Sequence, residues 1–149
     1  MALAIRTITQ AISQIDVSGV RFMDIDEIPE SVDPRLPVFF PEPAGFVSDF
    51  SIEDNSFGTG LTAKMTAAYT LTYTFAYAPI GSERGLFAQY PEMVDKAFLI
   101  LDALIQSIPV DGSVNMEIIN TLNFGPVSDP SGAPFHGCQV KIRVSEFVN

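Results

Sequence analysis

The residues best suited to nucleophilic chemistry are His136 and Cys138, the only histidine and the only cysteine in this 149-residue chain. In an extended segment, residues two apart project to the same side, so the imidazole is placed to activate the thiol. Cys138, however, begins an alternating apolar segment that continues to Val148, and no acid is evident to orient the histidine. We therefore predict a buried, inert thiol rather than a catalytic dyad.

The acidic residues between positions 24 and 33 are a candidate calcium site, because carboxylates are preferred Ca²⁺ ligands. The set is Asp24, Asp26, Glu27, Glu30 and Asp33. An EF-hand loop counted from Asp24 needs glycine at its sixth position and glutamate at its twelfth, where this sequence has Pro29 and Arg35. Residues 81–85 resemble a phosphate-binding loop but lack its Gly-Lys-Ser/Thr ending. The sequence predicts no metal, no cofactor and no enzymatic activity.

The charge and the cysteine content of the chain argue against several further classes of function. The chain carries 18 acidic and 8 basic residues, for a net charge of −10, and ten of the acids lie in residues 16–54. The absence of a basic patch disfavours nucleic-acid binding through phosphate contacts, and the same sign argument disfavours an anionic membrane surface. One cysteine cannot form an internal disulfide, and no signal peptide or membrane span is apparent. We expect a protein that is cytoplasmic when made.

The aromatic content is high for so few charges. Apolar residues make up 47% of the chain and charged residues 17%, with twelve phenylalanines and four tyrosines. This composition has two interpretations: a well-filled core, or a surplus of aromatic side chains that is buried between subunits. We favour the oligomer. The candidate interface residues are Phe39, Phe40, Phe46, Phe124 and Phe135.

The chain is organised around a long strand over residues 66–78. Tyr69, Leu71, Tyr73, Phe75 and Tyr77 alternate with small and β-branched residues, which predicts one aromatic face. Thirteen residues of strand would span about 40 Å, so the strand must bend or project beyond its domain. We expect it to pair antiparallel with residues 46–53.

Two amphipathic helices are predicted, over residues 2–15 and 91–108. The second should begin with Pro91 at its first helical position. It should pack against the aromatic face of the long strand through a broad apolar stripe. The stripe consists of Val94, Ala97, Phe98, Leu101, Leu104, Ile105 and Ile108.

The remaining segments are predicted from their prolines and their alternation. Residues 20–50 contain five prolines, which leave room for short extended pieces such as 20–25 and 36–40. Strands are expected at 114–122 and 138–148, the latter with an apolar face that includes Val140, Ile142 and Val144. Residues 123–137 hold three prolines and three glycines and are predicted to form a long loop.

The predicted fold is a single α+β domain over residues 1–149, with a mainly antiparallel sheet flanked by an N-terminal helix and one long amphipathic helix. This order of elements resembles the tail terminator proteins of long-tailed bacteriophages, the lambda-type family. The resemblance is carried by the strand at 69–78 running into Pro79-Ile80-Gly81, the helix at 91–108 and the strand at 140–148. The segment Tyr-Ala-Pro-Ile-Gly-Ser-Glu-Arg-Gly-Leu-Phe (77–87) is also of a type seen in tailed-phage virion proteins.

The resemblance implies a virion structural protein at the head-proximal end of the tail. Six copies would form a ring that caps the tail tube and binds the neck or head-completion proteins, while DNA passes through the central hole without specific binding. Two alternatives stay open. One is another ring of the neck, such as a head–tail connector or tail-tube component. The other is a small-ligand binding domain with a pocket lined by Tyr69, Tyr73 and Tyr77.

Overall fold

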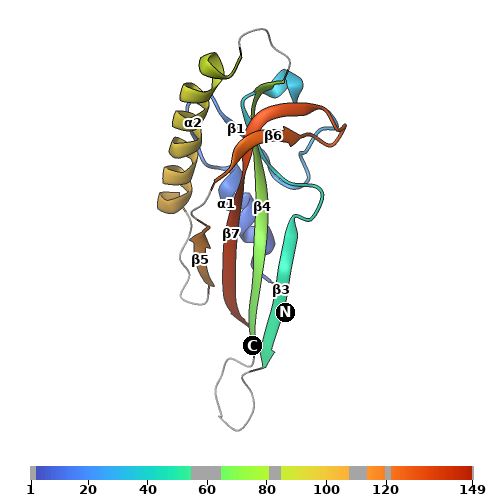
Figure 1. The fold of residues 1–149 in the computed structure, drawn as a ribbon. Coiled ribbons are helices and arrows are strands. Elements are labelled where there is room, and N and C mark those ends of the chain that lie inside the picture. The colour runs from blue at the N-terminus through green and yellow to red at the C-terminus, as the bar shows by residue number, and fades with distance from the viewer. Residues whose placement is uncertain (1–2, 55–64, 81–84, 108–113, 120–121, 149) are drawn as a thin grey trace.

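Two long strands form the centre of the fold. The computed structural model describes residues 3–54, 65–80, 85–107, 114–119 and 122–148, and it shows an α+β fold with a mainly antiparallel sheet. Strands β4 (Met65–Pro79) and β7 (Pro134–Val148) each have 15 residues and pair antiparallel over nearly their whole length (Figure 1). The long strand predicted at 66–78 is therefore confirmed.

Each central strand carries two shorter strands, one after the other, along its outer edge. β2 (Val38–Pro41) and β3 (Val47–Asp54) both pair with β4, while β5 (Val114–Ile118) and β6 (Phe124–Ser128) both pair with β7, all antiparallel. The short strand β1 (Arg21–Phe22) is parallel to β2, which places β1 and β5 at opposite edges of the sheet. The predicted pairing of residues 46–53 with the long strand is confirmed by β3.

The central strands both bend and project. The upper part of β7 curves across the sheet together with β6, whereas the lower ends of β3, β4 and β7 extend beyond α2 (Figure 1). We call this lower end of the three strands the arm. One part of β4 thus belongs to the curled body of the sheet, and the other part belongs to the arm, which extends beyond α2.

Helices α1 (Ile5–Ser13) and α2 (Gly85–Ser107) pack on one face of the central pair and form the main core. Register pairs the aromatic side chains of β4 with the aliphatic side chains of β7, for example Tyr73 with Val140 and Leu71 with Ile142. All of these side chains are buried. The prediction that the aromatic face of the long strand packs against a helix is confirmed.

A second, smaller core lies on the other side of the curled sheet. Its buried residues are Met23, Val32, Val38, Phe40, Ala76 and Phe135. Successive residues of a strand point to opposite faces, so Phe39 of β2 enters the main core and Phe40 enters the second. Both phenylalanines are fully buried because both faces of this strand are covered.

Residues 123–137 form a β-hairpin, so the prediction of a long loop there is wrong. β6 pairs with the beginning of β7, with Ser128 opposite Pro134. The sequence Asp-Pro-Ser-Gly at 129–132 makes the turn, and Gly132 has a φ of 86°, which suits glycine. The prolines do not prevent pairing, because Pro126 is on an edge strand and Pro134 is the first residue of β7.

The turn of this hairpin is held by the buried carboxylate of Asp129. It accepts hydrogen bonds from the Ser131 and Ala133 backbone N–H groups, both at 3.0 Å, and from the Val32 N–H at 3.2 Å. Burial opposes ionisation of Asp129, but hydrogen bonds from Ser131, Val32 and Ala133 outweigh it and lower its pKa. The hairpin is therefore tied to the segment that precedes β2.

Helix α2 begins earlier than predicted and is rotated relative to the prediction. It starts at Gly85, so Pro91 lies inside the helix rather than at its first position. Its buried residues are Met93, Ala97, Ile100 and Leu104. The predicted stripe is correct at Ala97 and Leu104, and Leu101 is half-buried, but it is wrong at Val94, Phe98 and Ile105, which are exposed. Ile108 lies outside the described residues.

The buried face of β7 ends with a charged residue that the predicted alternation left out. Glu146 follows Val144 on the same face and is 5% exposed. Its carboxylate accepts a hydrogen bond of 2.5 Å from the Tyr69 hydroxyl and bonds of 3.1 and 3.2 Å from the Ala4 N–H. Since Ala4 precedes α1, the carboxylate satisfies a backbone donor at the helix N-terminus and holds α1 against the sheet.

Candidate partner surfaces

The five phenylalanines predicted as interface residues are mostly core residues. Phe39, Phe40 and Phe135 are at most 2% exposed, so the expectation that they face a partner is wrong for the folded chain. Each belongs to a strand whose side chains are covered on that face. Phe46 and Phe124 are partly buried, and Phe46 packs edge-on against Tyr73 with ring centroids 5.5 Å apart.

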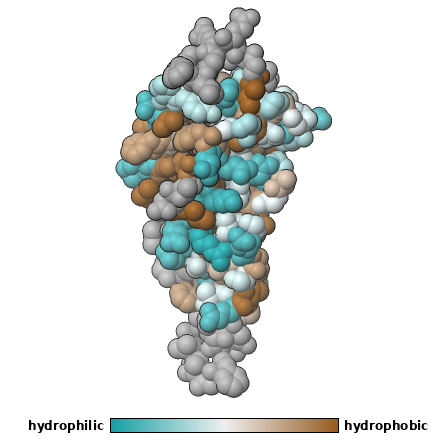
Figure 2. Space-filling view, viewed as in Figure 1, coloured by the Kyte–Doolittle hydropathy of each residue, from teal (hydrophilic) through white to brown (hydrophobic). Residues whose placement is uncertain are grey.

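Among the described large apolar side chains, the two with the highest exposed fraction are instead on α2. Val94, Phe98 and Ile105 are 42%, 68% and 68% exposed, and together with half-buried Leu101 they follow the helix at spacings of four, three and four residues. We call these four residues the α2 stripe. Figure 2 shows hydrophobic surface over α2. Exposed apolar patches of this kind mark interaction sites in soluble proteins.

A second exposed apolar surface lies on the arm. Val47, Phe50 and Ile52 of β3 and Phe147 of β7 are 40%, 48%, 58% and 56% exposed, and we call them the arm patch. Phe50 stacks on Tyr69 with ring centroids 5.7 Å apart, which anchors this surface to the core. Figure 2 shows a smaller hydrophobic area over the lower part of β3. The arm patch and the α2 stripe belong to different elements and different ends of the molecule.

A polar cavity lies beside the β6–β7 hairpin. It has a volume of about 730 Å³, and its lining includes Glu42, Gln139, Lys141 and Phe124. The Glu42 carboxylate accepts a hydrogen bond of 2.5 Å from the Thr74 hydroxyl and a longer one of 3.4 Å from the Gln139 amide. The Glu42 carboxylate therefore already has hydrogen-bond partners within the chain.

The tyrosines proposed to line a ligand pocket are packed rather than open. Tyr69 and Tyr73 are fully buried, and Tyr77 is half-buried. Tyr73 stacks on Phe39 with ring centroids 4.9 Å apart, and its hydroxyl has no hydrogen-bond partner among the described residues. Burial raises the pKa of both Tyr69 and Tyr73 well above the ordinary value, and a hydrogen bond to Glu146 raises that of Tyr69 further.

His136 and Cys138 are both packed against other side chains of the fold. Cys138 is fully buried in the main core, and burial raises the pKa of its thiol to about 12, so the thiol is protonated at neutral pH. His136 is half-buried and packs edge-on against Tyr90 at 5.9 Å. The predicted buried thiol is confirmed, and the thiol has no thiolate character with which to act as a nucleophile.

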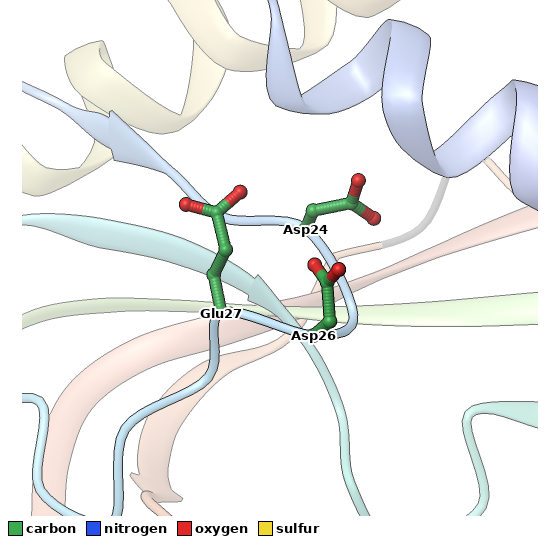
Figure 3. Close-up of side chains that lie close together, drawn as sticks. All are labelled: Asp24, Asp26 and Glu27. Carbon is green, nitrogen blue, oxygen red and sulfur yellow. The ribbon is translucent and has the colours of Figure 1, made fainter.

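Three of the acidic residues considered for calcium do converge. Asp24, Asp26 and Glu27 each place one carboxylate oxygen within 4.8 Å of the others, and all three rise from one bend of the chain after β1 (Figure 3). Asp26 and Glu27 are exposed, and the Asp24 carboxylate accepts the Ile25 N–H at 2.7 Å. Water can solvate such a cluster, and its residues come from a single short segment, so the arrangement alone does not define a metal site.

Comparisons with known proteins do not assign a function, so the exposed surfaces of the chain are the main source of functional information. No protein-family model matches the chain, and no curated protein matches it. Among the described residues, no helix is long and apolar enough to cross a membrane. The α2 stripe and the arm patch are the features that a functional hypothesis has to explain.

Proposed function

We propose that this chain is a virion structural protein of a long-tailed bacteriophage, a tail terminator. Copies of the chain assemble into a ring, expected to be a hexamer, that caps the head-proximal end of the tail tube and joins it to the neck or head-completion proteins. The protein is made in the host cytoplasm and has no catalytic role. The observation that carries this proposal is the presence of two separate exposed apolar surfaces, the α2 stripe and the arm patch.

Two different surfaces suit a subunit that contacts several neighbours at once. A two-fold dimer uses the same patch on both copies, whereas a ring needs two distinct patches that meet head to tail. A terminator also contacts the tube on one side and the neck on the other. The arm, with the exposed side chains Phe50, Ile52 and Phe147, offers a surface that projects away from the helices for such an axial contact.

The charge of the chain supports a passage for DNA rather than a DNA-binding site. The net charge is −10, and nucleic-acid affinity depends on lysine and arginine contacts to phosphates. An acidic subunit would let a DNA duplex pass through a ring without holding it. A neck connector or a tail-tube subunit would use the same properties, so these remain related candidates.

A small-ligand binding domain is the candidate from another class, and the polar cavity beside β6 is the observation that favours it. A volume of about 730 Å³ is large enough for a small molecule, and Lys141 and Glu42 supply opposite charges in its lining. The lining is polar, however, whereas ligand pockets are mostly apolar. We therefore rank it second.

Assembly with the tail tube distinguishes these functions. The purified chain is analysed by light scattering and negative-stain imaging, alone and after addition to tail tubes polymerised from the tube protein. A ring with a central hole that binds one end of the tube and stops its growth is the expected result. A monomer that leaves tube length unchanged would contradict the terminator proposal, and ligand screening against the polar cavity would then test the second candidate.

A further inference from the structure

We infer that copies of this chain associate head to tail, with the α2 stripe of one copy seated in a groove at the β1 edge of the next. The inference rests on the proposed self-assembly and adds which surfaces meet. Three features of the molecule support this pairing: the shape and charge of the groove, the charge beside the stripe, and the positions of the two surfaces on one molecule.

The groove is lined by both apolar side chains and two exposed arginines. It has a volume of about 360 Å³, and its lining includes Val20, Leu36, Pro37, Arg21, Arg35 and Asp16. Arg21 and Arg35 are exposed, and within the described part of the chain neither guanidinium makes a hydrogen bond or an ion pair. With Asp16 counted, the groove keeps an excess positive charge in a strongly acidic molecule. A ridge that is apolar and acidic would fit it.

The α2 stripe is such a ridge. Asp95 and Asp102 are exposed on the outward side of α2, next to the stripe and seven residues apart, which is about 10 Å along the helix axis. Within residues 90–106 the helix has three acidic side chains against one basic side chain, Lys96. An arginine forms bidentate bonds with a carboxylate, so Asp95 and Asp102 can pair with Arg35 and Arg21 of a neighbour. Phe98 would then pack against the apolar side chains of the groove lining, such as Leu36 and Pro37.

The stripe and the groove face different directions, as a head-to-tail contact requires. Lys96 lies on the flank of α2 opposite the stripe, and its ammonium donates a hydrogen bond of 2.8 Å to the Ser18 carbonyl. Residues 16–21 continue from there into the groove, which is at the β1 edge of the sheet. The helix layer therefore has the stripe on one side and the groove on the other. Repeating such a contact closes a ring when the rotation between copies allows it.

A mixing experiment tests the pairing of these two surfaces. Phe98→Asp removes the stripe but keeps the groove, and the double variant Arg21→Glu/Arg35→Glu removes the groove but keeps the stripe. Each variant alone should be a monomer of about 16.2 kDa by light scattering. A one-to-one mixture should contain a species of twice that mass and no larger ring, because it restores a single interface per pair.

A charge exchange tests the proposed ion pairs directly. Adding Asp95→Arg and Asp102→Arg to the Arg21→Glu/Arg35→Glu chain should recover the wild-type mass. Ile80→Asp immediately after β4 and Arg6→Glu on α1 are matched controls, because both residues are exposed and lie outside the stripe, the groove and the arm patch. Circular dichroism of every variant checks that the fold is retained.

The outcomes separate this inference from the proposed function. Rings that persist in both the Phe98→Asp and the Arg21→Glu/Arg35→Glu variants would overturn the inferred interface and leave the terminator proposal intact. A wild-type chain that stays monomeric at all concentrations, and does not bind tail tubes, would overturn both.

Discussion

The helix-facing side of the central strands and the outward side of α2 are built from similar residues, but only the first is covered. On the strands, Tyr73 and Phe75 are fully buried against α1 and α2. On α2, Phe98 and Ile105 are equally apolar and 68% exposed. The comparison shows that regularly spaced apolar residues identify a surface that can be buried. Which element, or which other protein, covers that surface depends on the rest of the assembly.

The largest expected effect concerns Gly137, a buried residue of β7. A Cβ added there would lie 1.8 Å from the Phe75 carbonyl oxygen and 2.9 Å from Val127 Cγ2. Because the nearest atom belongs to the backbone, Gly137→Ala should cost more than about 4 kcal/mol of unfolding free energy, or prevent folding. Urea denaturation followed by circular dichroism measures this.

Gly125 is the matched control for Gly137, since the two residues are opposite each other in the β6–β7 register. A Cβ at Gly125 would have no atom of the described residues within 4 Å. Gly125→Ala should therefore change the unfolding free energy by less than about 0.5 kcal/mol. Equal effects of the two substitutions would mean that β6 and β7 are not packed as described.

The next prediction compares the two faces of α2 directly. Leu104→Ala should lower the unfolding free energy of the monomer by about 2–5 kcal/mol, because Leu104 is fully buried. Phe98→Ala should change it by less than about 0.5 kcal/mol, although it removes the larger side chain. Both are measured with the Arg21→Glu/Arg35→Glu substitutions present as a common background, so that assembly does not contribute to the measured stability. A large loss from Phe98→Ala in that background would place Phe98 in the core.

Much of the fold could be predicted from local patterns. The alternation in residues 69–77 identified β4, and the Asp-Pro-Ser-Gly turn at 129–132 gave a signal for the β6–β7 hairpin that the count of prolines and glycines concealed. Edge-strand prolines lose no ladder hydrogen bond, and so proline content was a poor guide to the length of the loop.

The buried face of α2 could not be predicted in the same way. Residues 93, 97, 100 and 104 form one apolar row, and residues 94, 98, 101 and 105 form another, displaced by one position around the helix. Both rows have helical spacing, and only the three-dimensional packing decides which one meets the sheet. The candidate interface was missed for this reason: its residues were assigned to the core, whereas Phe39, Phe40 and Phe135 were assigned to the surface.

A further prediction concerns two tyrosine hydroxyls in the covered region. The Tyr69 hydroxyl donates to Glu146, whereas the Tyr73 hydroxyl is buried without a hydrogen-bond partner in the part of the chain that the structure describes. Tyr69→Phe should cost about 1 kcal/mol, and Tyr73→Phe should be neutral or stabilise the fold by up to about 1 kcal/mol, since leaving a buried polar group unpaired is unfavourable. Urea unfolding at neutral pH measures both.

Alkaline pH gives these two substitutions a second readout. The pKa of Tyr69 and that of Tyr73 are raised by burial, so the folded chain keeps protons that the unfolded chain releases near pH 10. The unfolded state then binds fewer protons than the folded state, and the unfolding free energy must fall as the pH rises above about 10. Each substitution should make that decline shallower between about pH 9 and about pH 11. If the unfolding free energy of both variants fell as steeply as that of the wild type, the two hydroxyls would be in contact with water. The strand face would then not be covered at these tyrosines, and its contrast with the exposed face of α2 would be wrong.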